Sequence, residues 1–189
     1  MALTKLMEDR QATYQITGPN AFNLYGFDNQ VPQTTYVYNN RISGERSISG
    51  MKFVLIKVSD SRLGSTTTFS GPDGVPAVYS SKPRALFDAV YDWSRFGGIP
   101  RAYEWIKKTI REDPTLLNKL IAVALKFGNQ GTIRRMGYLL ENLGVGSPRL
   151  RPLRKALRPS KGLIPFDPTK PLQGKISKDW GIIANDKTE

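Results

Sequence analysis

The segment ITGPNAFNLYGFDNQVP, residues 16–32, constrains the fold more than any other part of the chain. Gly18 and Pro19 predict a helix start, because a proline at the first helical position loses no backbone hydrogen bond. The apolar residues that follow form one face of a short helix, and Gly26 predicts its left-handed end. A QVP turn and the β-rich run TTYVYN come next. The segment therefore predicts a small amphipathic helix that leads through a turn into a strand.

Composition excludes several classes of catalytic site. The 189 residues contain neither cysteine nor histidine. Disulfides, thiolate metal sites, cysteine nucleophiles, zinc chemistry and histidine-dependent triads are therefore ruled out. The acidic residues are scattered, with no pair at a spacing that suggests a magnesium site. We expect a binding protein that is not an enzyme and needs neither metal nor cofactor.

Targeting features favour the cytoplasm. The N-terminus MALTKLMEDRQATY carries early charges of both signs and no continuous apolar stretch, unlike a secretory signal. No apolar run approaches the ~20 residues that are needed to cross a bilayer. We therefore expect a cytoplasmic protein that does not insert into a membrane.

Positive charge is concentrated toward the C-terminus. The chain has 28 Lys and Arg against 16 Asp and Glu, a formal net charge of +12. Residues 127–189 hold 12 basic and 5 acidic residues, so this third of the chain carries +7 of the excess. Such a balance favours association with polyanions or acidic proteins and says nothing about the fold.

The order of the expected elements predicts an α+β fold. Three strands are expected in a small, mainly antiparallel sheet, separated by turn-rich segments. They are residues 35–38, 52–58 and 75–79. A helical bundle-like half follows, with helical spacing in residues 81–93, 100–110, 113–128 and 132–143. Strands first and helices afterwards are typical of α+β domains.

We expect residues 1–146 to form one α+β domain. Residues 147–189 form a basic, Pro-rich C-terminal segment. Ser147 and Pro148 predict one short helix there, and the prolines exclude helix from most of the rest. This segment is expected to lie extended over the domain and to end in a closing strand at residues 180–184.

Four blocks, in order, resemble AbiEi-type antitoxins of type IV toxin–antitoxin systems. The first is the helix and QVP turn of residues 16–32. The second, SKPRALFDAVYDW at residues 81–93, is similar to a helix with an S-x-x-R-A-L-x-D-A pattern. The third, KFGNQGTIRRMGYLLENLG at residues 126–144, resembles the signature G-N-x-x-x-x-x-R-x-G-x-L-L-E-x-x-G. The fourth consists of PFDPTKP and WGIIAND in the C-terminal segment.

This resemblance implies the antitoxin region that opposes a nucleotidyltransferase-fold toxin encoded beside it, in an abortive-infection system of phage defence. Members of the family usually begin with a winged helix-turn-helix that binds operator DNA and represses the operon. In this sequence 15 residues precede Ile16, too few for such a module. The resemblance therefore implies one of two cases: an antitoxin that consists of this region alone, without autorepression through that module, or a protein whose true start lies further upstream.

Two basic clusters are the candidate binding residues. They are Arg134 and Arg135 in the third block, and Arg149, Arg151, Arg154, Lys155, Arg158 and Lys161 in the C-terminal segment. An arginine pair near a helix start can bind phosphate or the acidic groups of a partner, helped by the free N–H groups beside Gly131. In the structural alternative, one arginine pairs with Glu141 or a carboxylate of the sheet, and the other is solvated.

The C-terminal cations form either a solvated face or a contact with nucleic acid. No aromatic residues alternate with them, which argues against stacking on single strands. Any such binding should therefore follow the phosphate backbone, fall steeply with salt and ignore sequence. We expect only weak, non-specific DNA binding.

Other charged and aromatic residues are expected to be structural. Asp88 and Asp92 are spaced to pair with Arg84 and Arg95 along a helix. Aromatic residues of the sheet and helices are expected in the core or at its rim, where an exposed minority can anchor a protein partner.

Three functions stay open. The first is the AbiEi-type antitoxin, and the second is a basic DNA-binding regulator of its own operon that uses residues 127–161. The third is a nucleotide-handling enzyme, which lacks support because the chain has no P-loop and no clustered carboxylate site. If Arg134 and Arg135 dock the toxin, reversing their charge should abolish neutralisation with the fold intact. Neutralising the arginines of the C-terminal segment should then reduce DNA binding and leave neutralisation of the toxin intact. They are Arg149, Arg151, Arg154 and Arg158.

Overall fold

The computed structural model describes residues 2–70, 74–159 and 162–186. The chain divides into two compact units, Met1–Asp88 and Ala89–Glu189, which we call the N-terminal unit and the C-terminal unit. Their boundary lies within helix α3 (Lys82–Tyr91) and not at residue 146, where we expected a domain to end. The C-terminal helix belongs with the preceding helices because it packs against two of them.

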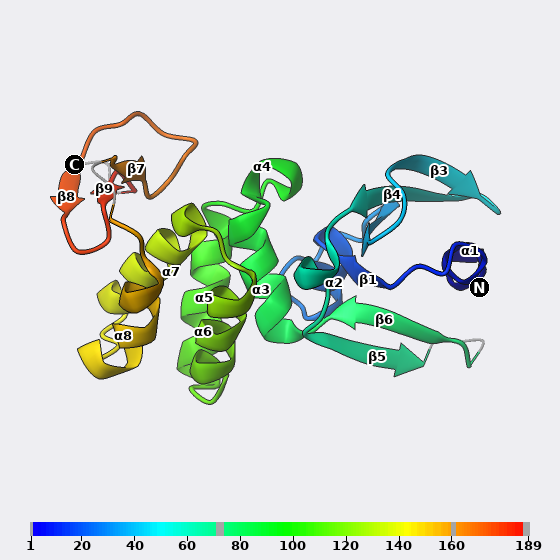
Figure 1. Ribbon diagram of the computed structural model, residues 1–189, viewed down its shortest axis with the longest axis horizontal. Coiled ribbons are helices and arrows are strands. Elements are labelled where there is room, and N and C mark those ends of the chain that lie inside the picture. Colours follow the sequence, from blue (N-terminus) through cyan, green and yellow to red (C-terminus); the bar gives the residue numbers. More distant parts are fainter. Residues whose placement is uncertain (1, 71–73, 160–161, 187–189) are drawn as a thin grey trace. The chain divides into compact units, whose positions relative to one another are not determined.

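The N-terminal unit is built on a six-stranded sheet with the order β3-β4-β2-β1-β6-β5 (Figure 1). Its strands are β1 (Tyr14–Thr17), β2 (Thr34–Asn39), β3 (Gly44–Ile48), β4 (Met51–Lys57), β5 (Thr66–Ser70) and β6 (Pro76–Ser80). Three of the five neighbouring pairs are antiparallel, and two, β1 with β6 and β2 with β4, are parallel. The expected α+β class is confirmed: a mainly antiparallel sheet comes first in the chain and the helices follow.

Three of the six strands, β1, β3 and β5, were not expected from the sequence. Strand β1 has only four residues, and β3 and β5 expose nearly all of their side chains, so none of them has the alternation that marks a half-buried strand. They form because longer neighbours pair with them. Strand β1, for example, lies between β2 and β6.

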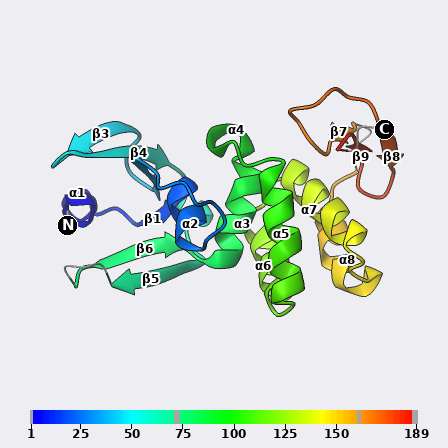
Figure 2. The ribbon, with the colours of Figure 1, turned by 180° about the vertical axis from the view of Figure 1, so that it is seen from behind.

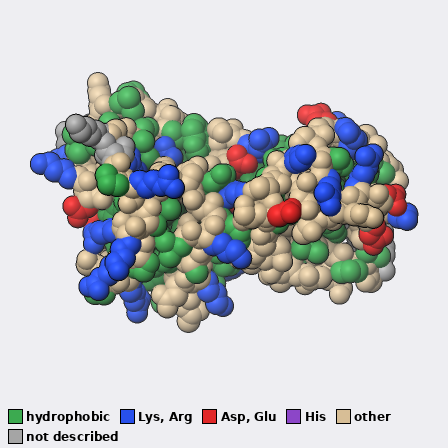
Figure 3. All heavy atoms as spheres, viewed as in Figure 1, with side chains coloured by type: hydrophobic (Ala, Val, Ile, Leu, Met, Phe, Trp, Pro, Cys, Tyr) green, Lys and Arg blue, Asp and Glu red, His purple; other side chains and the backbone are tan. Residues whose placement is uncertain are grey.

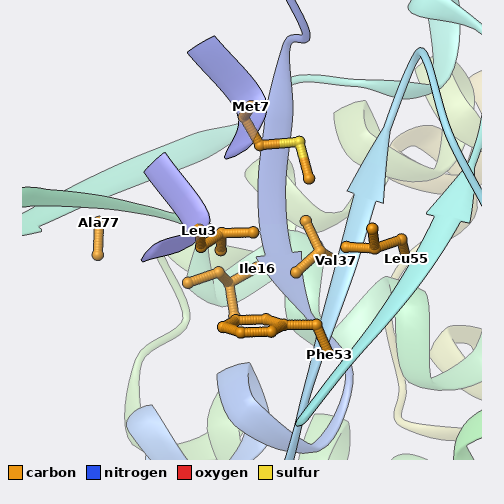
Figure 4. Close-up of a cluster of buried hydrophobic side chains, with 7 residues drawn as sticks. All are labelled: Leu3, Met7, Ile16, Val37, Phe53, Leu55 and Ala77. Carbon is orange, nitrogen blue, oxygen red and sulfur yellow. The ribbon is translucent and has the colours of Figure 1, made fainter. Parts of the chain in front are cut away.

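A core forms where helix α1 (Ala2–Asp9) packs against the sheet. The helix contributes Leu3 and Met7, which lie four residues apart and therefore share one helical face. Five buried side chains of the sheet complete the cluster. They are Ile16, Val37, Phe53, Leu55 and Ala77 (Figure 4). Burial of this apolar face holds α1 on the sheet.

The short helix expected near the start of the chain is α2 (Pro19–Leu24), and its proline is the first helical residue, as expected. Gly18 and Gly26 flank it with φ angles of 59° and 70°, left-handed values that favour glycine. The side-chain oxygen of Asn20 accepts a hydrogen bond from the backbone N–H of Tyr36 at 2.9 Å. This bond joins α2 to β2.

Helices make up most of the C-terminal unit. After α3 they are α4 (Trp93–Phe96), α5 (Arg101–Glu112), α6 (Leu116–Phe127), α7 (Gln130–Asn142) and α8 (Ser147–Ala156). Helix α5 contacts α6, α6 contacts α7, and α8 lies against both α6 and α7 (Figures 1 and 2). The helical ranges expected from residue 81 to residue 143 are confirmed to within a few residues. No helix in the described part of the chain is long and apolar enough to cross a membrane.

Helix α8 is an integral part of this unit. Its Leu150 and Leu153 are fully buried, as are Leu120 of α6 and Met136 of α7. These leucines of α8 therefore pack into the core between the helices. Helix α8 is the short helix expected after Ser147 and Pro148, and it packs against α6 and α7.

The chain after α8 forms a small sheet of three strands in the order β7-β9-β8. They are β7 (Ile164–Pro165), β8 (Lys175–Ser177) and β9 (Ile182–Ala184). Strand β9 is the expected closing strand, although it begins at Ile182. Trp180 precedes it and is buried.

Candidate binding surface

Arg134 lies in a helix whose first turn is already capped. The side-chain oxygen of Asn129 accepts a hydrogen bond from the backbone N–H of Thr132 at 2.8 Å, so one N–H of the expected anion site is used within the chain. Arg134 itself is 7% exposed, and its Nη1 donates to the carbonyl oxygen of Gly162 at 2.8 Å. Its guanidinium therefore binds the segment that follows α8.

Arg135 binds the same segment three residues further on. Its Nε donates to the carbonyl oxygen of Pro165 at 3.1 Å. Burial lowers the pKa of Arg135, while the nearby Tyr103 and Asp167 oppose this shift. Arginine keeps its charge in proteins in spite of such shifts, so the contact is that of a cation with a backbone dipole.

Tyr103 of α5 holds the neighbouring residue of this segment. Its hydroxyl donates to the carbonyl oxygen of Phe166 at 2.6 Å, and the two rings stack with their centroids 4.1 Å apart. Burial raises the pKa of Tyr103 far above its usual value, so the hydroxyl remains a donor. Residues 162–166, which follow α8, are thus bound from two helices, α5 and α7.

Arg134 and Arg135 do not have the partners that the structural alternative predicted. Within the described part of the chain, neither arginine forms a salt bridge with Glu141 or with a carboxylate of the sheet, and neither is exposed. Both donate to backbone carbonyl oxygens of the C-terminal segment. The physical reason is that these oxygens lose water when the segment packs on α7, and buried acceptors require donors.

Glu141 is paired instead with Arg154 of α8. Nη2 of Arg154 contacts Oε1 of Glu141, and Nη1 donates to the hydroxyl of Ser147 at 2.8 Å. The guanidinium also lies 5.0 Å from the ring centroid of Trp180, whose Nε1 donates to Oε2 of Glu141 at 2.9 Å. Arg154 therefore joins α7, α8 and Trp180.

Trp180 is accommodated by a glycine of α7. A Cβ atom at Gly137 would lie 2.1 Å from Cζ3 of Trp180, a distance that no side chain tolerates. Sequence reasoning treated Gly137 only as part of a pattern and missed this contact. A glycine in the middle of an otherwise good helix was the available signal, since it weakens the helix unless packing requires it.

Four candidate cations on and after α8 are exposed. They are Arg149, Arg151, Lys155 and Arg158. In Figure 3, Lys and Arg side chains gather at the lower left, over the position of α8 in Figure 1. We call these four residues the α8 basic surface. Lys161, the remaining candidate, lies outside the described residues.

Charge is unevenly divided between the two units. Residues 89–189 contain 19 basic and 9 acidic residues, a balance of +10, whereas residues 1–88 contain 9 and 7, a balance of +2. Most of the net positive charge therefore lies in the unit that carries the α8 basic surface.

The ion pairs expected along the helices are confirmed. Nε of Arg84 lies 2.8 Å from Oδ1 of Asp88 with both side chains fully buried, and Arg95 lies 3.2 Å from Asp92 nearer the surface. The other oxygen of Asp88 accepts hydrogen bonds from the hydroxyls of Thr17 and Ser80, at 2.9 and 3.2 Å. Sequence reasoning missed this buried network, because polar residues of short strands do not show which way they face.

No group of three acidic side chains that could hold a metal ion occurs among the described residues. The chemistry available at the surface is that of cations and hydrogen-bond donors. It suits the binding of phosphates or of carboxylates on a partner.

Comparison with known proteins supports the fold. No protein-family model and no curated protein matches the sequence. Among solved structures, the crystal structure of the RV2827C protein from Mycobacterium tuberculosis is similar, with a TM-score of 0.52 and 16% sequence identity. The match covers 96% of this chain and 65% of that chain. At this identity the similarity is one of fold.

Proposed function

We propose that this protein is an AbiEi-type antitoxin, not an enzyme, that neutralises a nucleotidyltransferase-fold toxin of a type IV toxin–antitoxin system. One observation carries the proposal: residues of the family-like blocks form the contacts that hold this fold together. Because the matching residues hold the fold together, the resemblance supports a shared architecture. The four blocks are distributed along most of the chain.

The third block supports this most clearly. Its first glycine, Gly128, lies between α6 and α7, and a Cβ there would lie 2.3 Å from the carbonyl oxygen of Ala124 in α6 and 2.9 Å from Cγ1 of Ile133 in α7. Four other signature residues cap α7, bind the C-terminal segment, admit Trp180 and pair with Arg154. They are Asn129, Arg135, Gly137 and Glu141.

The second and fourth blocks are used in the same way. Arg84 and Asp88 of the second block form the buried ion pair of the N-terminal unit. In the fourth block, the side chain of Asn185 accepts from the backbone N–H of Asp167 and donates to its carbonyl oxygen, both at 2.8 Å. These reciprocal bonds close the C-terminal segment.

A toxin must then be recognised by residues outside these contacts. Arg134, Arg135 and Arg154 are occupied by intramolecular partners, so we place the docking site on the α8 basic surface. Arginine is over-represented at protein interfaces, and a positive patch favours a partner with an acidic one.

Growth rescue tests the proposal. The toxin gene beside this one is expressed with the wild-type protein or with a variant in which Arg149, Arg151, Lys155 and Arg158 are changed to glutamine. A matched control changes four exposed lysines elsewhere, Lys52, Lys57, Lys175 and Lys178, so the loss of charge is equal. We expect rescue by the wild type and the control and its loss in the α8 variant. Absence of rescue by soluble, folded wild-type protein would refute the antitoxin proposal.

A second candidate is a basic DNA-binding regulator. It is favoured by the +10 balance of the C-terminal unit and by the exposure of the α8 basic surface. Tight, salt-resistant binding to the gene's own upstream region, with little binding to a scrambled sequence, would support this function over neutralisation.

A further inference from the structure

The two edges of the six-stranded sheet differ in how they are protected. The edge strands are β3 and β5. An edge strand presents unpaired N–H and C=O groups to any other strand, and proteins block such edges with charges, prolines or bulges. An edge that lacks these features is open to pairing.

Strand β3 is blocked. It carries the charged residues Glu45 and Arg46 on five residues, GERSI. Nη1 of Arg46 donates to the carbonyl oxygen of Glu45 at 2.7 Å, so a side chain already occupies this backbone acceptor. A second strand would have to displace that bond and desolvate the charges.

Strand β5 has none of these protections. Its sequence TTTFS contains no charge and no proline, has high β propensity, and is exposed except at Phe69. The ring of Phe69 packs on one side of the strand, at 5.8 Å from that of Tyr79. Strand β5 is therefore paired with β6 along one edge, and its exposed side chains are polar.

The register shows which backbone groups face outward. The backbone N–H of Ser81 donates to the carbonyl oxygen of Ser65 at 2.8 Å, and Thr66 lies opposite Ser80. In an antiparallel pair, the backbone groups of alternate residues bond to the partner strand. The N–H and C=O groups of Thr67 and Phe69 therefore face β6, while those of Thr66 and Thr68 face outward. Neither threonine has a backbone partner on that side within the described chain.

We propose that β5 pairs antiparallel with β5 of a second copy of this chain, joining two sheets into one. With the two-fold axis at Thr68, each Thr68 lies opposite its counterpart and Thr66 lies opposite Ser70. All the outward groups of one strand then meet complementary groups of the other, as a two-fold interface requires. The opposed side chains are hydroxyl residues, which pair favourably across strands.

Charge favours a second copy at this edge. The chain carries +12 in all, but the N-terminal unit carries only +2 and β5 carries none. The strand and the unit that carries it therefore add little charge repulsion between two copies. Because a single pair of strands buries less than the ~1,200 Å² of most stable interfaces, we expect a dimer that depends on concentration.

The inference is independent of the antitoxin proposal, and mass measurement tests it. Sedimentation velocity should show the mass of the wild type rising toward that of a dimer as concentration increases. The variant Thr68→Lys places two ammonium groups opposite each other and should remain a monomer. Gln33→Lys adds the same charge at an exposed site outside β5 and should dimerise like the wild type.

Hydrogen exchange of the wild type provides a readout that needs no variant. The amides of Thr66 and Thr68 should become protected as concentration rises, while that of Glu45 on the opposite edge should not change. The proposal is overturned by a monomer at every concentration, or by a dimer in which these two amides stay unprotected. Protection that arises only when a different protein is added would also overturn it.

Discussion

At the scale of single residues, Gly137 is a position in the C-terminal unit where packing leaves no room for a side chain. It is the point at which α7 admits the ring of Trp180, and Glu141 one turn later accepts the hydrogen bond of that ring. Helix geometry explains the pairing, since residues four apart lie on one face. The position therefore fixes where the C-terminal segment meets α7.

The substitution Gly137→Ala should destabilise the protein by ~1–3 kcal/mol, because the added methyl group overlaps Trp180 and overpacking has costs of this order. Gly131→Ala is the matched control in the same helix. A Cβ there has no neighbour closer than 3.5 Å, so alanine should be neutral or stabilise by up to ~1 kcal/mol through its helix propensity. Urea unfolding measures both. Equal stability of the two variants would contradict this account of Gly137.

The buried pair of Arg84 and Asp88 leads to a second prediction at this scale. Asp88→Ala should cost ~3–5 kcal/mol in the free energy of unfolding, because it leaves the guanidinium of Arg84 buried without its counter-charge. The control Asp92→Ala removes a pair whose arginine is 45% exposed, and it should cost at most ~1 kcal/mol. Denaturant titration compares the two, and similar losses would show that burial does not set the cost.

At the scale of elements, the C-terminal segment is held by side chains that donate to its backbone. Arg134, Arg135 and Tyr103 bind three carbonyl oxygens within residues 162–166, and Gln130 of α7 donates to the carbonyl oxygen of Ala156 at 3.0 Å. The described residues after α8 form only short strands, so these bonds replace the ladder that a longer strand would provide.

Charge reversal of Arg134 should therefore release this segment. Arg134→Glu places a carboxylate beside the carbonyl oxygen of Gly162 at a nearly buried position, which leaves two acceptors without a donor. We expect faster proteolysis between residues 157 and 186 and a lower unfolding midpoint. Arg151→Glu, on the exposed side of α8, should change neither.

The same variant distinguishes two causes for a loss of growth rescue, structural damage and the loss of a docking contact. If Arg134→Glu loses rescue together with protease resistance, the loss is structural. Loss of rescue with full stability and resistance would return Arg134 to the docking surface and contradict the structural role described above.

At the scale of the whole molecule, the uneven charge directs any contact with nucleic acid to the C-terminal unit. The α8 basic surface is exposed, and its side chains emerge from one short helix. Contacts of this kind bind phosphates and carry no information about sequence.

DNA binding should consequently be weak and should disappear between low and physiological salt. Changing Arg149, Arg151, Lys155 and Arg158 to glutamine should reduce the slope of log K against log salt by up to ~4, because each phosphate that is no longer neutralised changes that slope by about one. Fluorescence anisotropy with duplexes of different sequence measures this. A slope unchanged by the four substitutions would exclude the α8 basic surface from DNA binding.

What the sequence determined by itself was mostly local. Pro19, the glycines beside it and the 3.6-residue spacing of apolar side chains predicted the helices and the α+β order, because capping and periodicity act over a few residues. The pair of Arg84 and Asp88 was predictable for the same reason, since both lie on one helix.

Only the tertiary structure decided which partners distant residues have. Strands β3 and β5 form because neighbours pair with them, and Arg154 binds Glu141 because α8 packs on α7. Arg134 and Arg135 bind carbonyl oxygens about thirty residues away because burial of the C-terminal segment removed water from those oxygens. Which acceptors lose water depends on how the whole chain packs, and no local pattern of residues contains that information.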